Sequence, residues 1–173
     1  MSSETTRGRL AGKTGVEARM FSSAEFRLDD DGSNIVRVSG YGSTFEPYKV
    51  HDGGPGGYFV EQILPGAFRG VVKSSDCVLQ ANHSGIALAR VPSTMTLAED
   101  AKGLRWEASL DCRSAAATDL LVALERKDVR ACSFGFRLKA GDDEWNADQS
   151  RRTIRNVSEV FDISPPVSRI PGR

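Results

Sequence analysis

The chain has 173 residues, of which 39% are hydrophobic, and its 23 lysines and arginines balance 23 aspartates and glutamates. This apolar share is enough for a folded core, so the composition excludes a chain that is disordered throughout. A net charge of zero argues against a nucleic-acid-binding protein, which normally carries more basic than acidic residues. The sequence also lacks the run of about 18 apolar residues that a membrane helix requires.

Few residues could hold a metal or act as a base at neutral pH. Cys77, Cys112 and Cys132 are odd in number and form no Cys-x-x-Cys motif, which disfavours a disulfide framework and a structural zinc site. We therefore expect no metal, no cofactor and a reducing compartment. A reaction that needs an imidazole must use His51 or His83.

The first half of the chain changes from a polar arm to short extended segments. Residues 1–18 are polar and charged and predict a disordered arm. Alternating apolar and polar side chains predict a strand at 35–41, and residues 51–57 are so rich in glycine that they predict a flexible surface loop. Residues 58–64 have an extended pattern, and Pro65 begins a predicted short helix that ends near Val72.

The next segment contains short strands followed by one longer helix. The predicted strands are 76–81, 86–91, 94–98 and 104–110. Ser114 is placed to cap a helix over residues 115–127. The apolar stripe of this helix is formed by Leu120, Leu121 and Leu124.

The last part of the chain returns to the strand pattern. Strands are predicted at 129–138 and 154–163, with a charged loop at 140–152 between them. The whole pattern predicts a mainly β, α+β fold, a closed or nearly closed antiparallel β-barrel flanked by a few α-helices. The domain is expected to span residues 19–168, and residues 169–173 form a tail.

The strand at 129–138 has two very different faces. Its apolar face carries Cys132, Phe134, Phe136 and Leu138. Ser133 lies on the other face between Ala131 and Gly135, whose small side chains would let a substrate backbone approach the hydroxyl. Ser133 is therefore either an ordinary outward-facing strand residue or a nucleophile.

His83 is the better candidate for a base that activates such a serine. A serine hydroxyl is a weak nucleophile until a base takes its proton, and imidazole suits this task near neutral pH. His83 directly follows a predicted strand, whereas His51 begins the glycine-rich loop. A general base must be held within about 3 Å of its proton donor, which favours His83. The alternative is a solvated histidine in a turn.

Glu159 is the candidate for a third member of the site. Its predicted strand face also carries Val157, Phe161 and Ile163, whereas Asn156, Ser158 and Asp162 lie opposite. A carboxylate on an apolar face needs a partner, and an imidazole that it orients would be one. The other possibilities are a salt bridge to Arg130, Arg137 or Arg155, or an orienting acid at Asp76, Asp111 or Asp162 instead.

Six short motifs occur in the order in which one protein family carries them. They are Gly40-Tyr41-Gly42-Ser43-Thr44-Phe45, Pro65-Gly66-Ala67-Phe68, Asn82-His83, Gly103-Leu104, Ser133-Phe134-Gly135-Phe136 and Glu159-Val160. Through them, residues 34–168 resemble the tailed-phage prohead proteases, capsid-maturation serine proteases related to the herpesvirus assemblins. The chain departs from the family pattern at Ser84, where an aspartate is usual, and at Phe161, where a serine is usual.

The resemblance implies a serine endopeptidase with Ser133 as nucleophile, His83 as general base and Glu159 as the third member. It implies cleavage of scaffold, or of the scaffold-like arm of the major capsid protein, and of the chain itself. This would take place inside the assembling procapsid in the host cytoplasm, without nucleic acid or membrane as partner. The resemblance also admits a homodimer or higher oligomer. The alternative is an inactive, protease-derived β-barrel that serves as a scaffold or interaction protein in capsid assembly.

Overall fold

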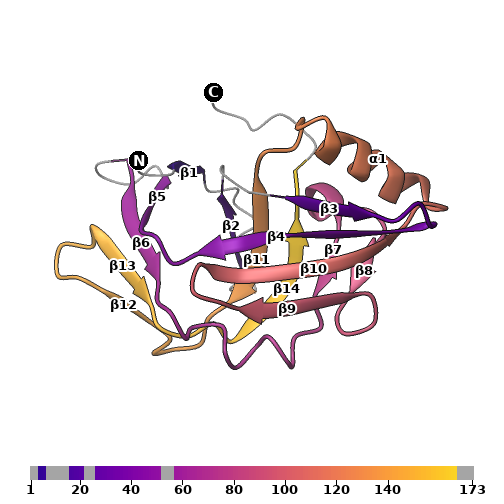
Figure 1. Ribbon diagram of the computed structural model, residues 1–173. Helices are drawn as coiled ribbons and strands as arrows, with labels where there is room; N and C mark the ends of the chain where they lie inside the picture. Colours follow the sequence, from indigo (N-terminus) through magenta and orange to yellow (C-terminus); the bar gives the residue numbers. More distant parts are fainter. Residues whose placement is uncertain (1–3, 7–15, 22–25, 52–56, 167–173) are drawn as a thin grey trace.

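A computed structural model describes residues 4–6, 16–21, 26–51 and 57–166, and in these residues the fold is mainly β with one α-helix (Figure 1). The elements in chain order are β1 (Glu4–Thr6), β2 (Val16–Phe21), β3 (Arg27–Asp30), β4 (Ile35–Thr44), β5 (Tyr48–His51), β6 (Phe59–Ile63), β7 (Val78–Leu79), β8 (Ala89–Arg90), β9 (Met95–Glu99), β10 (Gly103–Asp111), α1 (Ala115–Glu125), β11 (Cys132–Arg137), β12 (Asp143–Trp145), β13 (Arg151–Ile154) and β14 (Glu159–Ser164). The predicted α+β class is confirmed.

The described strands form three open sheets, so the predicted closed or nearly closed barrel is not found. Their orders are β1-β5-β6-β13-β12, β3-β4-β10-β9 and β2-β11-β14-β7-β8. Three neighbouring pairs are parallel, namely β1 with β5, β6 with β13 and β7 with β14. Strands β8 and β9 follow each other in the chain but lie at the edges of different sheets, and the turn between them contains Pro92.

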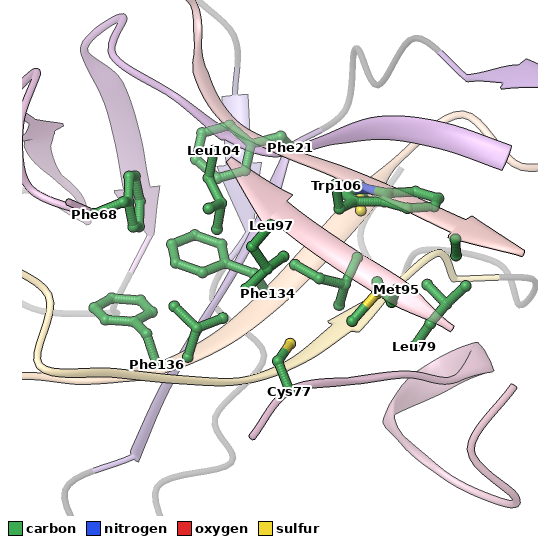
Figure 2. Packing of buried hydrophobic residues seen from close by; sticks show 14 of the residues in the cluster. Phe21, Phe68, Cys77, Leu79, Met95, Leu97, Leu104, Trp106, Phe134 and Phe136 are labelled. Atoms are coloured by element: carbon green, nitrogen blue, oxygen red, sulfur yellow. The ribbon is translucent and has the colours of Figure 1, made fainter. Parts of the chain in front are cut away.

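The main core lies between the sheet of β11 and β14 and the sheet of β4 and β10, whose strands cross in Figure 1. Figure 2 shows Phe68, Phe134 and Phe136 packed together, with the last two rings stacked at a centroid distance of 4.8 Å. Gly42 brings β4 close to this cluster, because a Cβ there would lie 2.8 Å from Ile163 Cδ1. The apolar face of β11 is therefore fixed against a second sheet, as predicted for Phe134 and Phe136.

Helix α1 begins where the sequence predicts. The Ser114 hydroxyl accepts a hydrogen bond from the Ala117 N–H at 3.4 Å, and the predicted leucine stripe is buried. The helix ends at Glu125 rather than at Lys127, because Lys127 has a left-handed φ of 61°. Among the described residues, no helix has both the length and the apolar character needed to cross a membrane.

The predicted helix from Pro65 to Val72 is wrong, because this segment is a series of turns. Gly66 has a φ of 98°, which a right-handed helix does not allow. The carboxylate of Glu99, at the end of β9, accepts hydrogen bonds from the N–H groups of Gly66 and Phe68, both at 2.9 Å. These contacts hold Phe68 in the core without a helix.

Two further expectations fail near the C-terminal part of the fold. The predicted charged loop at 140–152 contains β12 and the beginning of β13, which pair antiparallel. The predicted last strand at 154–163 is split between β13 and β14. Arg152 explains the first error, because its side chain points into the molecule and is only 9% exposed. A buried arginine removes the apolar alternation by which a strand is recognised.

The predicted disordered arm, residues 1–18, also differs from the structure where it is described. Residues 4–6 pair with β5, and residues 16–18 belong to β2, which pairs with β11. The other residues of the arm, like positions 52–56 of the predicted flexible loop and the tail at 169–173, lie outside the described residues. The chain therefore enters the sheet of β11 three residues before the expected domain boundary.

A buried network of charges attaches β2 to the rest of the molecule. Arg19 is buried and donates to Glu61 at 2.6 Å, and Glu61 also accepts from Tyr48 at 2.6 Å and from Arg152 at 3.0 Å. Glu17 accepts from both arginines at 2.7 Å. Removing one partner of such a network leaves a buried charge unpaired, at a cost of about 3–5 kcal/mol.

Glu17 makes the stability of this network depend on pH. Burial raises the pKa of Glu17, but hydrogen bonds and charges from Arg152 and Arg19 outweigh it and lower this pKa from 4.5 to about 2. A lowered carboxyl pKa contributes stability that is complete above 4.5 and is lost as the pH falls towards 2. We therefore expect Glu17→Gln to lower the free energy of unfolding at pH 7 by about 1.5–3 kcal/mol. The difference from wild type should shrink between pH 4.5 and 2.

Thermal unfolding of both proteins across this pH range would check the expectation. Glu144→Gln is the matched control, because its ion pair with Arg155 is exposed on both sides and such pairs contribute little. A difference between wild type and Glu17→Gln that stays constant from pH 7 to pH 2 would contradict this role of Glu17.

Candidate active site

A continuous series of hydrogen bonds joins Ser133, His83 and Asp162, which lie far apart in the sequence. The Ser133 Oγ is 2.8 Å from His83 Nε2, and His83 Nδ1 is 2.5 Å from Asp162 Oδ2. In the tautomer that satisfies all three groups, Nδ1–H donates to the carboxylate and the serine O–H donates to Nε2. A hydroxyl whose proton already points at a ring nitrogen is prepared to lose it to that nitrogen.

Ser133 is held by a strand that has neighbours on both sides. Strand β11 lies between β2 and β14, and the Cα partners of Ser133 are Met20 and Ser164. As predicted, Ser133 lies on the face opposite Phe134 and Phe136. Because those two rings are fixed in the core, the position of the Ser133 hydroxyl is fixed as well.

His83 lies at the end of a short 3₁₀ turn that follows β7. Asn82 and His83 have φ values of 55° and 53°, in the left-handed region that few non-glycine residues adopt. The His83 N–H donates to the Ser164 hydroxyl at 2.7 Å. Because Ser164 is also the cross-strand partner of Ser133, one residue ties the turn of the histidine to the strand of the serine. The His83 side chain keeps 20% exposure, so the ring remains in contact with the surface.

The carboxylate of Asp162 occupies space that a glycine leaves free. Asp162 is the Cα partner of Gly135, and a Cβ at position 135 would lie 2.3 Å from Asp162 Oδ1. The sequence interpretation assigned the bare surface beside Ser133 to an approaching substrate. In the structure, the space at Gly135 holds the carboxylate that contacts His83.

Glu159 does not reach the His83 ring, and this corrects the expected third contact. Its carboxylate accepts a hydrogen bond from Arg137 Nη1 at 2.8 Å, and its side chain is 44% exposed. This is the salt-bridge alternative considered for Glu159 from the sequence. Asp162, placed on the opposite strand face by the sequence pattern, makes the contact instead.

An irregularity in β14 explains why Asp162, rather than the predicted Glu159, contacts His83. The ladder pairs Gly135 with Asp162 and Phe136 with Val160, so Phe161 has no partner in β11. Such a β-bulge inverts the alternation of faces beyond it. Val160 and Ile163 are consequently both fully buried, although simple alternation places them on opposite faces. The period-two pattern counted from Glu159 could not detect this extra residue.

The other candidate groups lie outside the series of hydrogen bonds. His51 is exposed at the end of β5, with its ring 5.8 Å from that of Tyr58. Burial raises the pKa of the Cys77 thiol and raises that of Cys132 to about 12, so neither is a thiolate near neutral pH. Among the described residues, no group of three or more His, Cys, Asp or Glu side chains is arranged to hold a metal.

Comparison with known proteins points to the same family as the sequence motifs. A family model described as caudovirus prohead serine protease matches residues 22–170. The chain is 28% identical over 151 residues to the prohead protease of Enterobacteria phage HK97. This match covers 86% of the chain but 62% of the phage protein, so the chain spans less than two thirds of that relative. No solved structure matches the chain.

A substitution at Gly135 should disturb the contact between Asp162 and His83 while leaving the stability of the fold nearly unchanged. In Gly135→Ala, the new Cβ would collide with the end of the Asp162 side chain, which can rotate away without moving the backbone. We expect the free energy of unfolding to change by no more than about 1 kcal/mol. The rate at which a fluorophosphonate labels Ser133 should fall by about 10²- to 10⁴-fold, because the imidazole loses its partner. Denaturant unfolding and labelling kinetics measure the two effects, and an unchanged labelling rate would contradict the role given to Gly135.

Proposed function

Since the chain belongs to the caudovirus prohead serine protease family, we propose that it is a serine endopeptidase acting through Ser133, His83 and Asp162. Ser133 is the nucleophile, His83 the general base and Asp162 the residue that orients the imidazole. The observation that carries the proposal is the unbroken series of hydrogen bonds from the hydroxyl through the ring to the carboxylate. These are the roles that serine, histidine and an acid play in serine proteases on unrelated folds.

The first half of the reaction forms an acyl-enzyme. The Ser133 oxygen attacks the scissile carbonyl carbon while its proton passes to His83 Nε2, across the 2.8 Å contact. The resulting imidazolium keeps its Nδ1–H on Asp162, whose negative charge stabilises the positive ring. When the tetrahedral intermediate collapses, the carbon–nitrogen bond breaks and Nε2–H donates its proton to the leaving amine.

The second half releases the product by the same route. Water replaces the departed amine and attacks the acyl carbon, while His83 takes one of its protons. The carbon–oxygen bond to Ser133 then breaks, and His83 returns the proton to the serine oxygen. The two stages need no group beyond the three side chains to move protons.

We propose the proteins of the assembling capsid as substrates. Family membership supports cleavage of the major capsid protein or scaffold, and of the chain itself, inside the procapsid in the host cytoplasm. The relative in phage HK97 carries the name prohead protease, which supports the same stage of assembly.

The nucleophile is tested with a fluorophosphonate probe, which reacts with activated serines and requires no knowledge of the cleavage sequence. We expect the wild-type chain to be labelled at Ser133, and Ser133→Ala to lose labelling and at least about 10⁴-fold of its proteolytic rate. The fold should be retained, because the lost hydroxyl lies on the face opposite Phe134 and Phe136. His83→Ala should be equally inactive, whereas His51→Ala should keep its activity. A wild-type chain that is not labelled would favour the non-catalytic scaffold alternative.

Comparing variants of Asp162 and Glu159 tests which of these two acids orients His83. Asp162→Asn should lower the labelling rate by about 10²- to 10⁴-fold, as an amide cannot stabilise the imidazolium and selects the wrong tautomer. Glu159→Gln should change the rate by less than about threefold, because an exposed ion pair contributes little. Labelling kinetics of the two variants at pH 7 make the comparison, and the reverse ranking would return the role to Glu159.

A further inference from the structure

We propose that Met20 of β2 forms the wall of a substrate subsite beside Ser133, and that this subsite selects unbranched apolar side chains on the acyl side of the scissile bond. The inference rests on the proposed function, because it requires Ser133 to be the nucleophile.

Met20 is the residue of β2 that lies next to the hydroxyl. It is the antiparallel Cα partner of Ser133, and the side chains of such a pair share one face with Cβ atoms about 4.5–5.5 Å apart. Its chain neighbours Arg19 and Phe21 are buried on the other face, whereas Met20 is partly exposed. A molecule that reaches the Ser133 hydroxyl from the surface therefore meets the Met20 thioether.

The position of His83 decides which side of the scissile bond lies over Met20. The leaving amine must approach His83 Nε2, because that nitrogen supplies its proton. His83 is tied to Ser164, which flanks Ser133 on the β14 side. The acyl part of the substrate consequently extends towards the opposite neighbour of Ser133, which is β2.

The chemistry of this wall favours apolar side chains. After Met20, the next residue of β2 on the same face is Ala18, the partner of Gly135. Methionine is flexible and polarisable and adapts to unbranched apolar groups. The charged pair farther along this face, Arg137 and Glu159, is already joined by its own hydrogen bond. A charged substrate side chain placed against Met20 would lose water without gaining a partner.

The buried charge network keeps this wall in place. The guanidinium of Arg19 reaches Glu61 on β6, on the side of β2 away from Met20. Because Arg19 is also in contact with the Phe136 ring, at 5.5 Å from the centroid, the strand is anchored both to β6 of the neighbouring sheet and to β11 of its own sheet. A fixed strand gives Met20 a fixed distance from the hydroxyl, as selection by shape requires.

The probes are thiobenzyl esters of N-acetylated alanine, methionine, glutamate and lysine, which differ only in the side chain on the acyl side. We expect the wild-type chain to hydrolyse the methionine ester with a kcat/KM about tenfold or more above those of the charged esters. Met20→Ala should lower the methionine-to-alanine ratio of kcat/KM by about tenfold. Met20→Lys should favour the glutamate ester, and Met20→Glu the lysine ester, so that the order of the charged esters reverses between the two variants.

Two controls separate this inference from the proposed function. Val16→Ala, on the same face of β2 but opposite Arg137, should leave the order of the esters unchanged. Fluorophosphonate labelling of Ser133 should keep its wild-type rate in Val16→Ala. It should remain detectable in the Met20 variants, because they retain the three reacting side chains. Three results overturn the subsite alone, provided that Ser133 is labelled. They are hydrolysis of all four esters with similar kcat/KM, hydrolysis of none of them, and the same ranking of the esters in every Met20 variant. Loss of labelling in the wild-type chain overturns the proposed function instead.

Discussion

The register between β11 and β14 determines whether the candidate site exists. The Asp162 carboxylate can reach His83 only because it lies over Gly135, and it lies there only because Phe161 is accommodated as an extra residue in the ladder. A ladder without that bulge would pair Asp162 with Phe134 and turn its carboxylate into the core, away from Ser133. The extra residue Phe161 and the absence of a side chain at Gly135 therefore decide that Asp162, and not Glu159, contacts the imidazole.

The remaining parts of the molecule hold this register in place. The aromatic face of β11 packs against the β4 sheet through the close approach at Gly42, and the outer edge of β11 is covered by β2. Strand β2 is in turn attached to β6 and β13 by the buried charges around Glu61. Groups that are fixed before a reaction need no reorganisation during it, which is the main source of electrostatic catalysis. The core and the ion network therefore help to keep the side chains of Ser133, His83 and Asp162 at hydrogen-bonding distance.

The sequence predicted those parts of the site that follow regular alternation. The faces of β11, and hence the orientation of Ser133, came from period two, which left open whether this serine is a nucleophile. The choice of Ser133 together with His83 rested on the resemblance to the prohead proteases. Asp162 was considered only as an alternative to Glu159, because a bulge leaves no mark in a hydrophobic pattern. The β12–β13 hairpin was missed for a different reason, since the buried side chain of Arg152 is charged and its partners lie on distant strands. Both the bulge in β14 and the burial of Arg152 depend on contacts between residues far apart in the sequence, which a local pattern does not contain.

Glu159 and Asp162 carry the same chemical group three residues apart, and their surroundings give them different capacities. Glu159 is bonded to Arg137, so its charge is already compensated. The described contacts of the Asp162 side chain are with His83 and with the neutral amide of Gln80, and within the described residues no arginine or lysine pairs with it. A carboxylate that has no cation of its own can give its full attraction to a ring that becomes positive during the proposed reaction. Even a Glu159 side chain long enough to reach His83 would supply less of this stabilisation, because its charge is shared with Arg137.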